Sequence, residues 1–167
     1  MKALREAVRA ADFYRLKMDL DGFFILKPGD TKYVYNESLA YLYWLTGDDL
    51  AAAKVELAAS CHEQNSPAVR WTQTANFWTE RNAAIRTMAN LIAYEVMGKA
   101  THRDKLLAHL LDLQWHQDGA GGLIPANRVD GGLYHYGFQH DWDWPENSLG
   151  ASPLMSALLS DATARAE

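Results

Sequence analysis

Residues 39–59 read LAYLYWLTGDDLAAAKVELAA, and residues 89–111 read ANLIAYEVMGKATHRDKLLAHLL. Each stretch begins with an almost continuously apolar segment, passes through a glycine, and continues with apolar residues at helical spacing between polar ones. Gly47 and Gly98 hold equivalent places in the two stretches, so the chain contains an internal repeat. A repeated pair of helices cannot bury its apolar surface alone, and such units therefore stack. The repeat predicts an all-α protein built from antiparallel helical hairpins.

The spacing of apolar residues predicts six helices in all. Two of them, 36–46 and 79–97, are apolar on nearly every side, which is typical of helices that are buried all round. His102, His109 and His116 recur every seven residues within a fifth helix, and we expect them on a solvent-facing flank. The remaining helices are expected at 2–16, 49–64 and 101–116, with a last one that begins at Ser152-Pro153.

Composition narrows the class of protein. The chain has 167 residues, of which 49% are hydrophobic and 22% charged, and this predicts one folded helical domain rather than a low-complexity chain. The formal net charge of −5 argues against nucleic acid or an anionic membrane as a partner, because neither polyanion would be attracted over long range. Cys61 is the single cysteine, so no disulfide can form within the chain. No apolar run is long enough to span a bilayer.

Three segments carry a resemblance to known proteins. Residues 77–82 (FWTERN) open one buried helix, residues 94–98 (YEVMG) close it, and residues 152–159 (SPLMSALL) open the next. In this pattern the chain resembles the α/α-toroid proteins, the (α/α) barrels of glycosidases and of heparinase- and alginate-lyase-like polysaccharide lyases. The resemblance implies an inner and an outer layer of helices and a poly- or oligosaccharide as substrate.

The resemblance also implies that the toroid is incomplete. The chain holds about two and a half hairpins, fewer than a closed ring needs. We therefore expect a fragment of a larger toroid, or one that is completed by another copy. The last helix would then present an uncovered apolar edge of Leu154, Met155, Leu158 and Leu159, through which the chain self-associates or meets a further toroid segment.

The candidate site lies where the toroid would bring the starts of the inner helices together. The segment 117–150 contains seven glycines and no helical period, and connections of this length tend to be functional. It ends in a dense run of aromatic and ionisable residues, 134–148, that the toroid would bring towards the start of the helix at 79–97. The candidate catalytic residues are Glu80, Tyr136, His140, Asp141 and Asp143, and the candidate substrate-binding residues are Trp78, Arg81, Asn82, His135, Trp142 and Trp144.

These residue types suit two kinds of chemistry on sugars. A glycosidase needs two carboxylates, one protonated and one ionised, and Asp141 or Asp143 with Glu80 would supply them. A lyase instead uses a tyrosine or histidine as base, with arginine and asparagine neutralising a uronate carboxylate. Aromatic rings would stack on the sugar in either case. No metal and no cofactor is expected, because the spacing of the histidines and aspartates matches no zinc signature.

Structural interpretations of the same residues remain open. The tryptophans of the 117–150 segment would then fill gaps, its aspartates would cap backbone N–H groups, and Glu80 would be a first-turn acid favoured by the helix dipole. On that interpretation the protein is a helical-repeat module that binds a glycan or a protein partner without catalysis, or a structural piece of an assembly.

Overall fold

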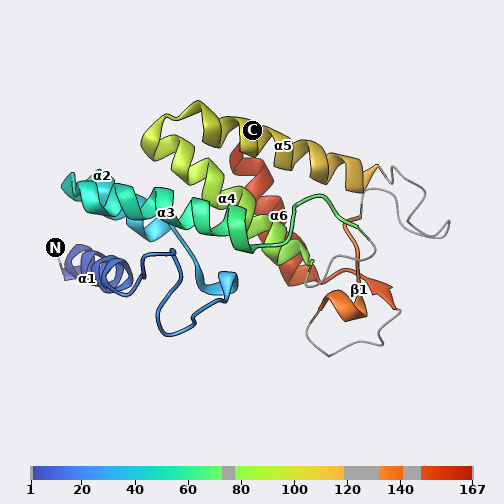
Figure 1. Ribbon diagram of the computed structural model, residues 1–167, viewed down its shortest axis with the longest axis horizontal. Coiled ribbons are helices and arrows are strands. Elements are labelled where there is room, and N and C mark those ends of the chain that lie inside the picture. The colour runs from blue at the N-terminus through green and yellow to red at the C-terminus, as the bar shows by residue number, and fades with distance from the viewer. Residues whose placement is uncertain (1, 73–77, 119–131, 141–147, 167) are drawn as a thin grey trace. The chain divides into compact units, whose positions relative to one another are not determined.

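The computed structural model describes residues 2–72, 78–118, 132–140 and 148–166 (Figure 1). Within these residues 70% of the chain is helical, in six α-helices and two short 3-10 turns, and the sheet has only two strands. The prediction of an all-α protein is therefore confirmed. No helix in the described ranges is both long and apolar enough to cross a membrane.

The elements follow the order that the periodicity indicated. Glycines at positive φ follow α2 and α4, namely Gly47 at 69° and Gly98 at 64°, and a side chain at either place would be strained. The bounds are α1 Lys2–Leu16, η1 Thr31–Tyr33, α2 Glu37–Thr46, α3 Asp49–Asn65, α4 Glu80–Met97, α5 Ala100–Gln117, β1 His135–Tyr136, η2 Gly137–Gln139, β2 Leu149–Gly150 and α6 Pro153–Ala166.

The chain divides into two compact units. Unit 1 consists of Met1–Ser66 with Ala89–Arg103, and unit 2 consists of Pro67–Met88 with Asp104–Glu167. Both α4 and α5 therefore contribute residues to each unit. The two units are described separately below.

Unit 1 is built on the α2–α3 hairpin. The Asp48 side chain accepts a hydrogen bond from the backbone N–H of Leu50 and so caps the start of α3. Helix α1 packs on this hairpin through a small cluster of Ala11, Leu42 and Ala51. Seven residues of α3 are buried, against three of α2. The hairpin that was predicted from the repeat is thus present, with its more deeply buried helix second rather than first.

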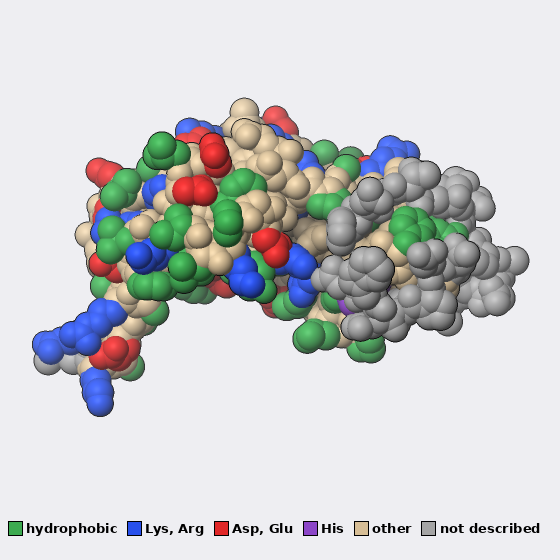
Figure 2. All heavy atoms as spheres, turned by 60° about the horizontal axis from the view of Figure 1, so that its bottom comes forward, with side chains coloured by type: hydrophobic (Ala, Val, Ile, Leu, Met, Phe, Trp, Pro, Cys, Tyr) green, Lys and Arg blue, Asp and Glu red, His purple; other side chains and the backbone are tan. Residues whose placement is uncertain are grey.

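The expectation that α2 is buried all round was wrong. Tyr41, Trp44 and Leu45 on this helix are about half exposed, at 50%, 49% and 58%. Hydrophobic side chains lie between charged ones on the face of the molecule in Figure 2. The absence of polar residues indicates that a helix gains nothing from contact with water. How much of its surface is buried depends on the neighbouring helices that pack against it.

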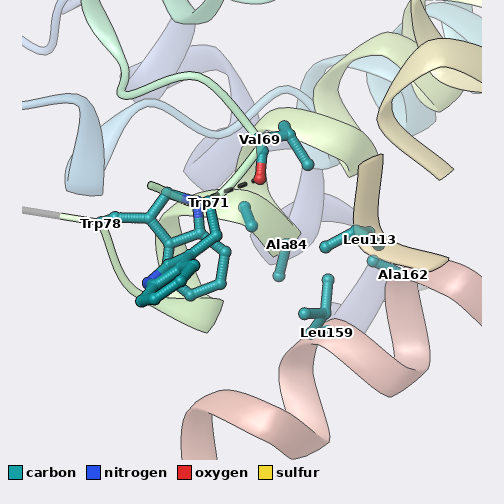
Figure 3. Packing of buried hydrophobic residues seen from close by; sticks show 8 residues of the cluster. Val69, Trp71, Trp78, Ala84, Leu113, Leu159 and Ala162 are labelled. Carbon is teal, nitrogen blue, oxygen red and sulfur yellow. Dashed lines mark hydrogen bonds between the residues drawn. The ribbon is translucent and has the colours of Figure 1, made fainter. Parts of the chain in front are cut away.

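Unit 2 has its own hydrophobic core, drawn in Figure 3. Two indoles dominate it, Trp71 and Trp78, each 1% exposed, and the Trp78 Nε1–H donates to the Val69 carbonyl at 3.0 Å. Helices α4, α5 and α6 meet around these rings, so this core joins three elements that are distant in the sequence. The cluster is Val69, Trp71, Trp78, Ala83, Ala84, Leu113, Leu159 and Ala162.

Helix α4 matches its prediction. Nine of its residues are buried, and on the described part of this helix Glu95 is the one exposed side chain. Thr79 directly precedes the helix, and its hydroxyl accepts a hydrogen bond from the backbone N–H of Asn82 at 3.4 Å. A helix that is enclosed in this way holds its first turn, which carries several of the candidate site residues, against the packed interior of unit 2.

The described part of the segment 117–150 is not wholly a loop. β1 and β2 pair antiparallel, with His135 opposite Gly150 and Tyr136 opposite Leu149. The backbone N–H of Gly137 donates to the Ser148 carbonyl at 2.9 Å beside this pair. The short sheet therefore fixes the backbone on which His135 and Tyr136 stand.

Helix α6 presents half of its predicted apolar edge. Leu154 and Leu158 are 73% and 43% exposed, whereas Met155 and Leu159 are buried, at 8% and 1%. The prediction of exposure was thus wrong for Met155 and Leu159, because both side chains are buried, and Leu159 belongs to the core of unit 2.

Candidate functional site

The centre of the candidate site is a carboxylate–imidazole pair inside unit 2. Glu80 stands in the first turn of α4 and His135 on β1, and both side chains are completely buried. The Glu80 Oε2 and His135 Nδ1 atoms lie 2.8 Å apart. Their orientation is not that of an aligned hydrogen bond, so the contact is a close charge pair when His135 is protonated. Glu80 Oε1 is also buried and has no hydrogen-bond partner in the described residues.

A second imidazole lies against the first. The rings of His135 and His140 stack with centroids 5.4 Å apart and planes 24° from parallel. The backbone N–H of His140 donates to the Gly137 carbonyl at 3.1 Å, which ends the η2 turn and places the ring. His140 is partly exposed, although its Nδ1 is buried, so the row of three side chains runs from a buried carboxylate to an imidazole of which a part reaches the surface.

Tyr136 belongs to a different set of contacts. Successive side chains of a strand point to opposite faces, so Tyr136 points away from His135. Its ring stacks on Phe138 at 5.6 Å and lies 6.0 Å from Trp71 between centroids. Like His140, Tyr136 is partly exposed. The surface of unit 2 therefore offers a phenol and an imidazole beside aromatic rings.

Gln139 anchors this part of the chain to the segment that precedes α4. Its Oε1 accepts the Trp71 indole N–H at 3.1 Å and the Tyr136 backbone N–H at 2.9 Å, and its Nε2 donates to the Thr72 carbonyl at 2.9 Å. Gln139 is completely buried. One amide thus joins two segments that are far apart in sequence, and sequence reasoning missed this residue because a single glutamine gives no periodic signal.

The expectation of a solvent-facing histidine flank on α5 was wrong. His102, His109 and His116 are 4%, 6% and 1% exposed. His116 stacks on Trp71 and meets Trp78 edge-on, both at 5.0 Å between centroids. A signal for this was present: the three histidines alternate with Leu106 and Leu113 at steps of four and three residues, the pattern of one buried helical stripe.

The other predicted site residues have mixed positions. Trp78 lies in the hydrophobic core, where it has no surface for a sugar ring. Arg81 and Asn82 are partly buried in the first turn of α4, and the Arg81 Nε is buried without a hydrogen-bond partner in the described residues. The structure thus brings Glu80, His135 and His140 together and places Tyr136 nearby on the opposite face of β1. Asp141, Trp142, Asp143 and Trp144 lie outside the described residues.

Metal binding has no support in the described ranges, where no group of three or more histidine, cysteine, aspartate or glutamate side chains is arranged to hold an ion. What the cluster offers is acid–base chemistry: an accessible imidazole backed by a buried imidazole and a buried carboxylate, with a phenol close along the chain. Carboxylates commonly orient imidazoles in this way when the imidazole must exchange a proton.

Comparison with known proteins gives no further guide. No family model matches the chain, and neither a curated protein nor a solved structure is similar to it.

Proposed function

We propose that the chain is the substrate-binding part of a carbohydrate-active α/α-toroid protein and that unit 2 carries its acid–base group. The observation that supports this most is the row of Glu80, His135 and His140, in which a partly exposed imidazole is backed by a fully buried pair. The exposed aromatic surface of Tyr136 and Phe138 beside it provides flat rings of the kind on which sugars stack. The repeated helical hairpins agree with the toroid resemblance.

Elimination suits the described residues better than hydrolysis. Hydrolysis needs two carboxylates that both reach the glycosidic bond. Glu80 is completely buried beside His135 and offers no surface to a sugar. His140 and Tyr136 do reach the surface, and these residue types remove and return protons near neutral pH.

The proposed step is the cleavage of a uronate-containing polysaccharide by β-elimination. His140 or Tyr136, as base, takes the proton from the carbon next to the uronate carboxylate. The released electron pair forms a double bond to the neighbouring ring carbon, and the bond from that carbon to the glycosidic oxygen breaks. The oxygen leaves with its electron pair and receives a proton from water, because Tyr136 and His140 lie in separate sets of contacts and do not face one another.

Arg81 supports an acidic sugar as substrate. Arg81 is partly exposed, although its Nε is buried, so only the exposed part of its guanidinium could meet a ligand. A guanidinium pairs strongly with a carboxylate because it donates two parallel hydrogen bonds. Asn82, at the next position of the same turn, would add a neutral donor.

The test is a panel of soluble neutral and uronic polysaccharides. Elimination predicts a new ultraviolet-absorbing double bond together with shorter chains, from uronic polymers only. The variant that removes the base, His140→Gln or Tyr136→Phe, should lower the rate, whereas Tyr134→Phe, which removes a hydroxyl two residues away from Tyr136, should not. Shorter chains without the double bond would indicate hydrolysis, and saturable retention without turnover would indicate a binding module. No binding to any polymer would overturn the proposal.

A second candidate function, assembly through α6, is favoured by the exposure of Leu154 and Leu158. These two residues are one helical turn apart and so form one apolar stripe. We expect the molecular mass in solution to rise with protein concentration. Leu154→Glu with Leu158→Glu should abolish that rise, and Leu20→Glu, at a leucine that is 91% exposed in unit 1, should leave it. A monomer at every concentration would exclude this assembly.

A further inference from the structure

We infer that Glu80 is a positioning residue, which acts on His140 through His135 rather than on a ligand directly. The inference rests on the proposed function, because it assigns a role within the same site. It also changes the role that the sequence suggested for Glu80, which was that of a carboxylate in contact with the sugar.

Burial excludes direct contact between Glu80 and a ligand. Both Glu80 and His135 have no exposed side-chain surface, whereas His140 is partly exposed. The order from the interior to the surface is therefore carboxylate, first imidazole, second imidazole. A ligand on the surface of unit 2 meets the last of these three.

The contacts within the row allow Glu80 to orient the His135 ring and, through it, the His140 ring. The 2.8 Å charge pair holds the His135 ring from one edge. One face of that ring then lies against His140, with the two planes 24° from parallel. The backbone of His140 is held separately, by its bond to the Gly137 carbonyl. With both its backbone and one face of its ring held, His140 has few orientations left.

The energetics of Glu80 argue against a purely structural role. A buried carboxylate loses its hydration, and a single charge partner at best offsets that loss. Glu80 Oε1 in addition has no hydrogen-bond partner in the described residues, although the atom is fully buried. Apolar side chains of similar volume in place of both Glu80 and His135 would fill the same space without this cost. A carboxylate that is unfavourable for folding but pairs with a buried imidazole, which itself stacks on a partly exposed one, is typical of a functional site.

The experiment uses the full chain with 15N-labelled histidine and four variants. Glu80→Gln removes the charge and keeps the shape, and His135→Gln removes the first imidazole. The double variant removes both Glu80 and His135. Because its two glutamines are neutral, it leaves no unpaired buried charge, and we expect it to fold even if a single variant does not. Glu95→Gln removes the same charge from the exposed side of the same helix and serves as the control.

We expect Glu80→Gln to shift the ring signals of both His135 and His140, although Glu80 pairs only with the first. With soluble polygalacturonate as substrate, kcat should fall about tenfold or more while KM changes less than about twofold, because the ligand contacts remain. In the His135→Gln background, Glu80→Gln should cause no further loss, because its effect passes through His135. Glu95→Gln should change neither the signals nor kcat.

Two outcomes separate this inference from the proposed function. If no polymer is cleaved or bound, the proposed function fails, and a shift of the His140 signals on Glu80→Gln still upholds the positioning contact. If polygalacturonate is cleaved but Glu80→Gln leaves kcat and the His140 signals unchanged, the inference fails alone. Additive losses from Glu80→Gln and His135→Gln would also overturn it, because Glu80 would then act by another route.

Discussion

Replacement of Gln139 by leucine tests whether this amide holds the site together. Gln139→Leu removes the three hydrogen bonds that join η2 to residues 71 and 72 and to Tyr136, in a position that is completely buried. Leucine has a similar volume, so the change leaves the packing nearly intact and isolates the polar contacts.

The magnitude follows from the groups that are left without partners. Thr72 is exposed, so its carbonyl can turn to water. The Trp71 indole N–H, in a residue that is 1% exposed, and the Tyr136 backbone N–H lose their acceptor. A buried donor without an acceptor costs about 1–3 kcal/mol, which applies to the Trp71 indole, and the Tyr136 N–H adds less because its bond is only part-buried. That is a large share of the stability of a typical domain.

The assay is urea unfolding followed by tryptophan fluorescence, since Trp71 and Trp78 both lie in the core of unit 2. The matched control is Gln114→Leu, at an exposed glutamine of α5, which should change the free energy of unfolding by no more than about 0.5 kcal/mol. A Gln139→Leu protein that unfolds at the same urea concentration as the wild type would refute the argument, because the three bonds would then contribute nothing.

Three further predictions concern other parts of the chain. Leu91→Asp should prevent folding, because it places a charge at a position of α4 that is 6% exposed. The control Leu107→Asp, at a position that is 51% exposed, should still give a protein that melts cooperatively. A folded Leu91→Asp protein would contradict the observed burial. Burial raises the pKa of the Cys61 thiol to about 11 from an ordinary 9.0, so less of the reactive thiolate is present at pH 8. Iodoacetamide should therefore react roughly a hundredfold more slowly with the native protein than with the urea-unfolded protein. Equal rates would refute this. The Lys99 ammonium donates a hydrogen bond to the Glu56 carboxylate and lowers the pKa of that carboxyl. The pair therefore stabilises the fold above the ordinary carboxyl pKa, and this stabilisation is lost as the pH falls through the lowered pKa. Lys99→Gln should raise the pKa of Glu56 in an NMR titration and should lower the free energy of unfolding more at neutral pH than in acid.

Local sequence was sufficient to predict the helices and several of their ends. The start of α3 depends on Asp48 and the ends of α2 and α4 on Gly47 and Gly98, and each of these residues acts on backbone groups within a few positions of itself. The burial of α4 was also predictable, because its apolar side chains lie on nearly every side of the helix and gain little from exposure to water. Secondary structure and the all-α class thus followed from interactions between close neighbours in the chain.

The site was predictable only in part. The sequence singled out Glu80, His135 and His140 as residue types suited to acid–base chemistry, but nothing in their spacing indicated that the first two pair or that the last two stack. The burial of the α5 histidines was likewise not predicted from the sequence. An imidazole is polar enough to lie on a solvated surface and flat enough to pack against a tryptophan ring. For His116 the position of Trp71 beside it determined that the ring is buried.

The tertiary structure decided which of the predicted residues are accessible. Trp78 and Glu80 lie within four positions of Arg81 and Asn82, which are only partly buried. Trp78 and Glu80 are nevertheless enclosed, because α4, α5, α6 and β1 meet around them. Accessibility depends on contacts between segments that are distant in the sequence, and the identity of those contacts is not encoded in any one segment. The residues of this chain therefore determined its helices and the chemistry available to it, while packing determined that a buried carboxylate would stand behind an accessible imidazole.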